Sequence, residues 1–196
     1  MRYILLLITL TVFITSCGPE NYSPKPRGYY LLDLPKEHNY KVFNVPGFPY
    51  SFEYPAYSNI IRDSSFFNDK PENPYWIYID FPNLNARIYM SYKEMSEKYT
   101  LLKLMNDSHD LSWFNTKKAD YISEDLIDLP NRVSGIFYTV TGNAASTYQF
   151  MLTDSTKHFV RAGLYFNVSP NADSLKPVNE FLRKDMLHII ETMRWK

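Results

Sequence analysis

The segment RVSGIFYTVTGNAASTYQFMLTDSTKHFVRAGLYFNV, residues 132–168, determines the fold class. Three runs in it are rich in β-branched and aromatic residues, as strands are: residues 132–141, 146–153 and 158–168. The polar segment GNAA separates the first two runs and DSTK separates the last two, and connections of this length join neighbouring strands as hairpins. The segment therefore predicts a three-stranded antiparallel meander.

Helical periodicity flanks the meander on both sides. After it, five apolar residues recur at helical spacing, with Asp173 or Ser174 as the predicted N-cap and Pro177 in the predicted first turn. These apolar residues are Val178, Leu182, Met186, Ile189 and Met193. Before the meander, residues 94–106 show the same spacing, which is expected to continue, with or without a break, as far as Phe114.

Shorter strand-like runs precede the first helix, and residues 58–74, rich in Asn, Asp, Ser and Pro, predict an irregular loop. The predicted strands cover residues 29–34, 40–43, 50–54, 75–80 and 87–92, and a further strand at 120–127 leads into the meander. The predicted fold class is α+β, an antiparallel β-sheet with flanking helices. The order of these elements resembles the small α/β/α sandwiches of the PsbP and Mog1 kind.

The composition narrows the class of protein. Lys plus Arg and Asp plus Glu both number 21, and aromatic residues make up 17% of the chain. A net charge of zero gives no bulk attraction for nucleic acid. With one cysteine, no intrachain disulfide can form, so packing of a β-rich, aromatic core must provide the stability.

The N-terminus carries a targeting signal. Arg2 precedes an apolar run at residues 4–14 that is too short to span a membrane, which predicts a signal peptide. The following ITSC, ending at Cys17, resembles the lipobox of bacterial lipoproteins. That resemblance implies an S-diacylglycerol group, cleavage before Cys17 and N-acylation, the palmitate-type modification of a lipid anchor; the alternative is an ordinary secretory leader.

A segment rich in Pro and polar residues follows Cys17. Its eleven or so residues would reach roughly 34 Å in an extended form, so we interpret it as a tether. The predicted organisation is a signal peptide at 1–16, a lipidated cysteine and tether at 17–28, and one globular α+β domain at 29–196. Two or three acyl chains hold such a protein firmly on a bilayer.

The sequence shows no group of residues with the spacing of a catalytic or metal site. The histidines, at positions 38, 109, 158 and 188, lack the spacing of metal ligands, and we interpret His158 and His188 as ordinary strand and helix residues. Ser146 does not stand in a nucleophile-elbow motif, and Asp33, Asp80 and Asp120 are scattered. The sequence predicts no catalytic residue, no metal site and no cofactor.

Two serines fit a short O-glycosylation pattern of Bacteroidetes envelopes. Ser155 and Ser174 each follow an aspartate, in DST and DSL. The alternative is that Ser155 belongs to a turn and Ser174 to a helix cap. Both therefore remain modification candidates.

Seven blocks of sequence are spread along nearly the whole chain: PKPRGY (24–29), PYSFEYP (49–55), IDFP (79–82), GNAAS (142–146), LTDSTKHF (152–159), LYFN (164–167) and ETMRWK (191–196). In this order they resemble the gliding motility lipoprotein GldD family of Bacteroidetes. The resemblance implies a membrane-anchored envelope protein needed for gliding and type IX secretion, without known catalysis. It also implies an acylated Cys17.

Two classes of function follow. The first is a non-enzymatic assembly or stabilising subunit that contacts other gliding or type IX secretion proteins through an exposed apolar or aromatic patch. The second is a periplasmic lipoprotein that binds, and in one version hydrolyses, a small ligand or glycan in a pocket. We expect the anchor in the outer membrane facing the periplasm, with the inner membrane as the alternative.

Overall fold

The computed structural model describes residues 33–63, 71–114 and 119–196. All lie in the second of two compact units of the chain, residues 31–196. The predicted leader, Cys17, the tether and most of the strand predicted at 29–34 fall outside the described residues, and Asp33 and Leu34 are not in a strand. No described helix combines the length and the apolar character that crossing a bilayer requires.

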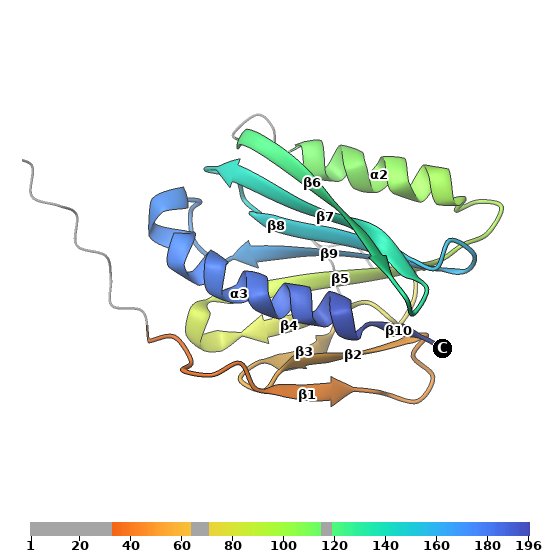
Figure 1. Cartoon of the computed structure of the whole chain (residues 1–196), viewed down its shortest axis with the longest axis horizontal. Helices are drawn as coiled ribbons and strands as arrows, with labels where there is room; N and C mark the ends of the chain where they lie inside the picture. The colour runs from red at the N-terminus through yellow and green to blue at the C-terminus, as the bar shows by residue number, and fades with distance from the viewer. Residues whose placement is uncertain (1–32, 64–70, 115–118) are drawn as a thin grey trace, which may run out of the picture. The chain divides into compact units, whose positions relative to one another are not determined.

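Seven strands form one antiparallel sheet in the order β3-β4-β5-β9-β8-β7-β6 (Figure 1). They are β3 (Asn59–Arg62), β4 (Ile77–Phe81), β5 (Ala86–Glu94), β6 (Ala119–Leu129), β7 (Val133–Gly142), β8 (Tyr148–Thr153) and β9 (His158–Phe166). The predicted meander is confirmed, since β7, β8 and β9 pair in sequence order. A short 3-10 helix, η1 (Pro82–Leu84), connects β4 to β5.

The long helix α3 (Ala172–Thr192) packs on one face of this sheet. All five residues of its predicted apolar stripe are buried. They share the main core with β9 residues that point to the same face, Val160, Ala162 and Leu164. The predicted buried face of the C-terminal helix is therefore confirmed.

A second, smaller sheet lies beside α3 and contains the first and the last of the described strands (Figure 1). It consists of β1 (Tyr40–Phe43), β2 (Tyr50–Pro55) and β10 (Arg194–Trp195), in the order β1-β2-β10. Tyr50 and Phe52 of β2 are almost fully buried and belong to the same core as α3. This sheet joins the N-terminal strands to the C-terminus.

Helix α2 (Leu101–Trp113) covers part of the opposite face of the large sheet. Its start differs from the predicted residue 94, because β5 continues to Glu94 and the side chain of Thr100 caps the helix by accepting the Lys103 N–H at 3.4 Å. The predicted extension toward Phe114 is confirmed, without a break. Leu104 packs against Phe159 of β9 in a second core cluster.

Three other predictions were wrong. The segment predicted as a loop at 58–74 contains β3, which pairs with β4. Asn171, and not Asp173 or Ser174, caps α3 by accepting the Ser174 N–H at 3.1 Å. Since the helix begins at Ala172, Pro177 lies inside it and not in its first turn.

The α+β class with antiparallel strands and two helices is confirmed by the strand pairing. The two faces of the large sheet differ in their cover. The α3 face holds the main apolar core, while the α2 face is covered near β7 and β8 and carries tyrosines on β4, β5 and β9. Surfaces open to a ligand or partner therefore belong to the α2 face and to the edges of the sheet.

The turn between β8 and β9 depends on Asp154. Its Oδ1 accepts the backbone N–H groups of Thr156, Lys157 and His158 at 3.0, 2.8 and 2.8 Å. Partial burial opposes ionisation, but these backbone hydrogen bonds outweigh it and hold the pKa of the Asp154 carboxyl well below its usual range. The charged form therefore stabilises the hairpin.

We expect Asp154→Asn to lower the free energy of unfolding at pH 7 by about 1 kcal/mol, because the hydrogen bonds lose a charged acceptor. The folded-state pKa lies below the unfolded-state value of about 3.9, so this contribution is complete above about pH 4 and is lost as the pH falls further. Urea unfolding at pH 7, 5 and 3 should show the difference between the two proteins shrinking only at pH 3. A difference that stays constant to pH 3 would contradict this account.

Candidate functional site

A buried carboxylate on α3 holds three segments together. Asp185 has no exposed surface. Its Oδ1 lies 2.7 Å from Nδ1 of His38 and accepts the hydroxyl of Tyr40 at 3.0 Å, while Oδ2 accepts the hydroxyl of Tyr57. These four residues, which we call the Asp185 cluster, join α3 to the segment before β1, to β1 and to the turn after β2.

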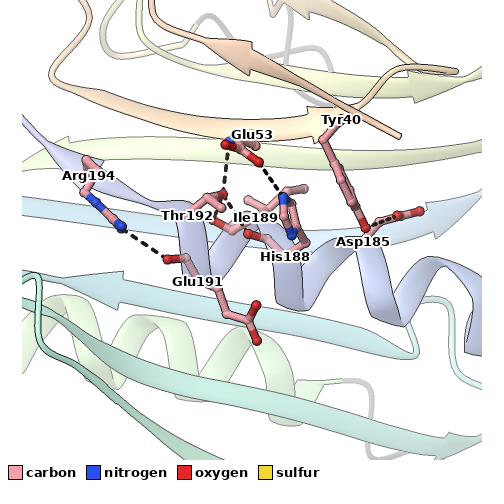
Figure 2. Close-up of polar contacts among 8 residues, drawn as sticks. All are labelled: Tyr40, Glu53, Asp185, His188, Ile189, Glu191, Thr192 and Arg194. Carbon is pink, nitrogen blue, oxygen red and sulfur yellow. Dashed lines mark hydrogen bonds and ion pairs between the residues drawn. The ribbon is translucent and has the colours of Figure 1, made fainter. Parts of the chain in front are cut away.

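The next turn of α3 adds a second histidine and carboxylate (Figure 2). Nε2 of His188 lies 2.7 Å from Oε2 of Glu53, and the Tyr40 ring stacks on the His188 ring with centroids 3.6 Å apart. The Thr192 hydroxyl accepts the Glu53 N–H at 3.0 Å and donates to the His188 carbonyl at 2.7 Å. His188 is thus a helix-face residue, as predicted, with a partner on β2.

The Asp185 cluster satisfies the hydrogen bonds of the polar groups that it brings together. Burial and the nearby Asp185 carboxylate raise the pKa of Tyr40 and of Tyr57 well above their usual range. Both phenols therefore stay protonated and act as donors, and the Thr192 hydroxyl is engaged at both its donor and acceptor sides. These hydrogen bonds indicate that the Asp185 cluster fastens residues 38–57 to α3.

The other two histidines lie apart from this cluster. His158 opens β9, as predicted, with its Nδ1 2.8 Å from the Tyr92 hydroxyl and its ring stacked on Trp195. Burial lowers the pKa of His158, which favours the neutral ring. Nε2 of His109 lies 3.6 Å from Oε1 of Glu124 on β6. In the described part of the chain, no three His, Cys, Asp or Glu side chains are placed to share a metal ion.

The remaining residues considered from sequence are dispersed. Ser146 is buried and donates to the Tyr148 carbonyl at 3.3 Å. Asp80 on β4 pairs with Arg87 at 2.6 Å, while Asp120 lies on β6 across the sheet and Asp33 is exposed before β1. The structure does not bring these groups into one site.

Both glycosylation candidates are exposed. Ser155 lies in the β8–β9 turn with a φ of 63°, and Ser174 lies in the first turn of α3. Ser155 thus belongs to a turn, as in the alternative interpretation, whereas Ser174 lies inside α3 and is not its cap, which is Asn171. Exposure leaves both accessible, and their modification stays a prediction.

Apolar side chains on the α2 face reach solvent. Leu126 on β6 is 85% exposed and Phe114 at the end of α2 is 74% exposed; Leu102, Leu111 and Trp113 of α2 are also exposed. The indole N–H of Trp113 donates to Glu124 at 3.2 Å, which connects the end of α2 to β6. We call this set of five apolar residues the α2–β6 surface.

Sequence reasoning missed the Asp185 cluster. Its members stand at positions 38, 40, 57 and 185, and only the pairing of β1 with β2 beside α3 brings them together. Asp185 itself gave one signal, since it interrupts the apolar face of a helix between Leu182 and Met186. A carboxylate that is buried on such a face needs donors, and that requirement could have identified it.

A search among curated proteins finds no match. The solution structure of cyanobacterial PsbP (CyanoP) from Synechocystis sp. PCC 6803 is similar, with 11% identity and a TM-score of 0.48 over 92% of this chain and 98% of that chain. The family model described as gliding motility lipoprotein GldD matches residues 19–195. The chain therefore belongs to the gliding motility lipoprotein GldD family.

Proposed function

We propose that this chain is a lipid-anchored, non-enzymatic component of the Bacteroidetes cell envelope that assembles or stabilises the gliding and type IX secretion machinery. Membership of a gliding motility lipoprotein family supports the general role and the anchor. The observation that carries the binding role is the exposed edge of β6, where Leu126 is 85% exposed. An exposed apolar residue on a sheet edge favours pairing with another chain.

The length and charge of β6 indicate the kind of partner. Among the described strands, β6 pairs with β7 alone, so its other side offers main-chain hydrogen bonds. Its eleven residues, ADYISEDLIDL, include four carboxylates and neither Lys nor Pro, two residues that commonly protect edges. The partner we infer is an extended segment of an envelope protein, with Lys or Arg, that adds as a strand beside β6.

We expect Leu126→Glu to abolish gliding and to reduce in-cell photocrosslinking of the partner about tenfold. Removing an apolar contact and adding a fifth carboxylate costs binding on the order of 1–2 kcal/mol, whereas the exposed position leaves the fold intact. Gliding is scored by microscopy at matched protein levels, with the photoreactive residue at position 121. The matched control is Val42→Glu, because Val42 is 66% exposed on the other sheet. Equal loss of gliding in both variants would contradict a role for β6.

The anchor itself is also part of the proposal. We expect Cys17→Ala to move the protein out of the membrane fraction while its near-UV circular dichroism stays unchanged, because the buried core residues of the domain run from Phe43 to Met193. Ser155→Ala serves as a control that should stay in the membrane fraction. A Cys17→Ala protein that fractionates like the parent would contradict the anchor.

We place the anchor in the periplasmic leaflet of the outer membrane, with the inner membrane as the alternative. In either case the domain faces the periplasm. Protease added to intact cells should therefore leave the domain uncut, and permeabilised cells should lose it. Digestion in intact cells would place the domain on the cell surface.

A second candidate function is binding of a small ligand or glycan, which a groove of about 380 Å³ favours. Tyr89 and Tyr165 line it with ring centroids 5.8 Å apart, and Asp80 and Arg87 supply polar groups. Asp80 is the single carboxylate among the lining residues, whereas glycoside hydrolysis usually uses two. Titration of peptidoglycan fragments should quench fluorescence in the parent and not in Tyr89→Ala if this function holds.

A further inference from the structure

Arg161 on β9 is a cation that is partly withdrawn from water. Its Nη2 donates to Oε1 of Gln149 at 2.5 Å, and its Nε is buried without a hydrogen-bond partner. No ion pair among the described residues includes Arg161. Burial lowers the pKa of Arg161, which shows that its surroundings disfavour the charge. Partly buried cations are normally balanced by an anion.

The cation lies in the lining of a groove of about 520 Å³ between α2 and strands β5 and β9. Its walls are mostly apolar, with Leu104, Leu111 and Phe114 on the helix side and Trp76 and Phe159 on the sheet side. Grooves of this size and character hold small ligands that are mainly apolar and are oriented by a few polar groups.

The polar groups beneath the groove are fixed in place. Gln149 is fully buried, and its Oε1 accepts both Arg161 and the hydroxyl of Ser112 on α2, the latter at 3.2 Å. The Nε2 of Gln149 has no hydrogen-bond partner. The Gln149 amide thus orients the Arg161 guanidinium. Two buried N–H donors, Arg161 Nε and Gln149 Nε2, have no acceptor. Both orphan groups require an acceptor and not a donor.

The charges around the groove favour an anionic ligand whose charged end lies at the buried part of the groove. Lys93 also lines the groove, but its ammonium is paired with Glu72 at 3.3 Å. Asp107 and Asp110 also line it, but both occupy exposed positions of α2, and the Asp110 side chain is 84% exposed, so water screens them. The least solvated charge is therefore positive.

The walls favour an aliphatic chain over a peptide. They consist of side chains from a helix and from strands β5 and β9, whose backbone groups are used in the helix and in the sheet pairing. A peptide would bring N–H and C=O groups that find few partners there, at a cost for each. A hydrocarbon chain brings none.

We infer that this groove binds a long-chain aliphatic carboxylate, with the carboxylate on Arg161 and the chain between α2 and the sheet. The inference goes beyond the proposed function, because it uses neither the edge of β6 nor the family role. It adds a ligand site to a protein proposed to act by assembly.

The test uses the mature full chain in phosphatidylcholine vesicles and a dodecanoic acid that carries a diazirine near its methyl end. After illumination, mass spectrometry should locate the label on peptides of α2 and β9, and unlabelled dodecanoate should compete. Arg161→Gln and the methyl ester of the probe should each reduce this labelling about tenfold or more, as expected for loss of a charged hydrogen bond.

Two further variants keep the result interpretable if Arg161→Gln folds poorly. Leu111→Glu places a carboxylate in the groove at a half-exposed position and should also abolish labelling. Arg183→Gln removes an arginine of α3, which packs on the opposite face of the sheet, and should label like the parent. Equal labelling by acid and ester would overturn the inference, as would labelling by photoreactive phosphatidylglycerol alone or stronger competition by an apolar peptide with a free C-terminus.

Discussion

Replacing Asp185 with alanine is expected to lower the free energy of unfolding by about 3–5 kcal/mol, as for other buried ionic networks that lose one partner. The substitution leaves the donors of His38, Tyr40 and Tyr57 without their acceptor. A domain of this size is stable by only about 5–15 kcal/mol, so the variant should be close to unfolding at 37 °C. Urea unfolding followed by tryptophan fluorescence measures the difference.

Two further variants distinguish the stability that the Asp185 cluster provides from the general effect of losing a carboxylate. Tyr40→Phe removes one of the three hydrogen bonds and should cost about 1 kcal/mol. Asp125→Ala removes an exposed carboxylate of β6 and should change stability by less than about 0.5 kcal/mol. If Asp185→Ala costs no more than Asp125→Ala, the cluster does not fasten α3 to the N-terminal strands.

Replacing Gly135 with alanine is the second large expected effect. A Cβ atom at Gly135 would lie 1.9 Å from the carbonyl oxygen of Met151 and 2.9 Å from its carbonyl carbon. Both atoms belong to the backbone of β8, so the strands themselves would have to separate. Overpacking of cores commonly costs about 1–3 kcal/mol, and we expect at least the upper value here, with loss of folded protein during expression.

The matched control for this prediction is Gly163→Ala. There the nearest atom to the added Cβ would be in the ring of Tyr165, at 3.0 Å, and a side chain can move more readily than a strand. We expect its midpoint in a thermal unfolding scan to lie well above that of Gly135→Ala. The reverse order would show that β7 and β8 adapt more easily than their spacing indicates.

The sequence predicted the elements whose pattern is local. The meander followed from short polar turns between apolar runs, and the buried stripe of α3 followed from helical spacing. Strand β3 was missed because Asn59–Arg62 holds only two apolar residues within a polar segment. Helix α2 was predicted to begin too early because the alternation of β5 ends in Lys93 and Glu94, which also suit a helix.

The candidate sites were harder to predict, since they depend on contacts between distant parts of the chain. From the sequence, a charged residue such as Arg161 in the middle of a strand is expected to face solvent. It lines the groove between α2 and the sheet only because α2 packs on that face. Leu126 looked like an ordinary strand residue until β6 proved to be the edge of the sheet. Periodicity predicts which face a residue occupies but not what covers that face.

The pairing of β10 with β2 has a consequence for when the domain can fold. Tyr50 faces Trp195 across this pair, and the Lys196 N–H donates to the Pro49 carbonyl at 3.0 Å. Strand β2 therefore pairs on one side with residues that come about 140 positions later in the chain. A ribosome makes β2 long before it makes β10. The small sheet stays unfinished until β10 has been made, and contacts between such distant segments form slowly. A chain truncated before Arg194 would therefore fold with β2 lacking one of its two neighbours.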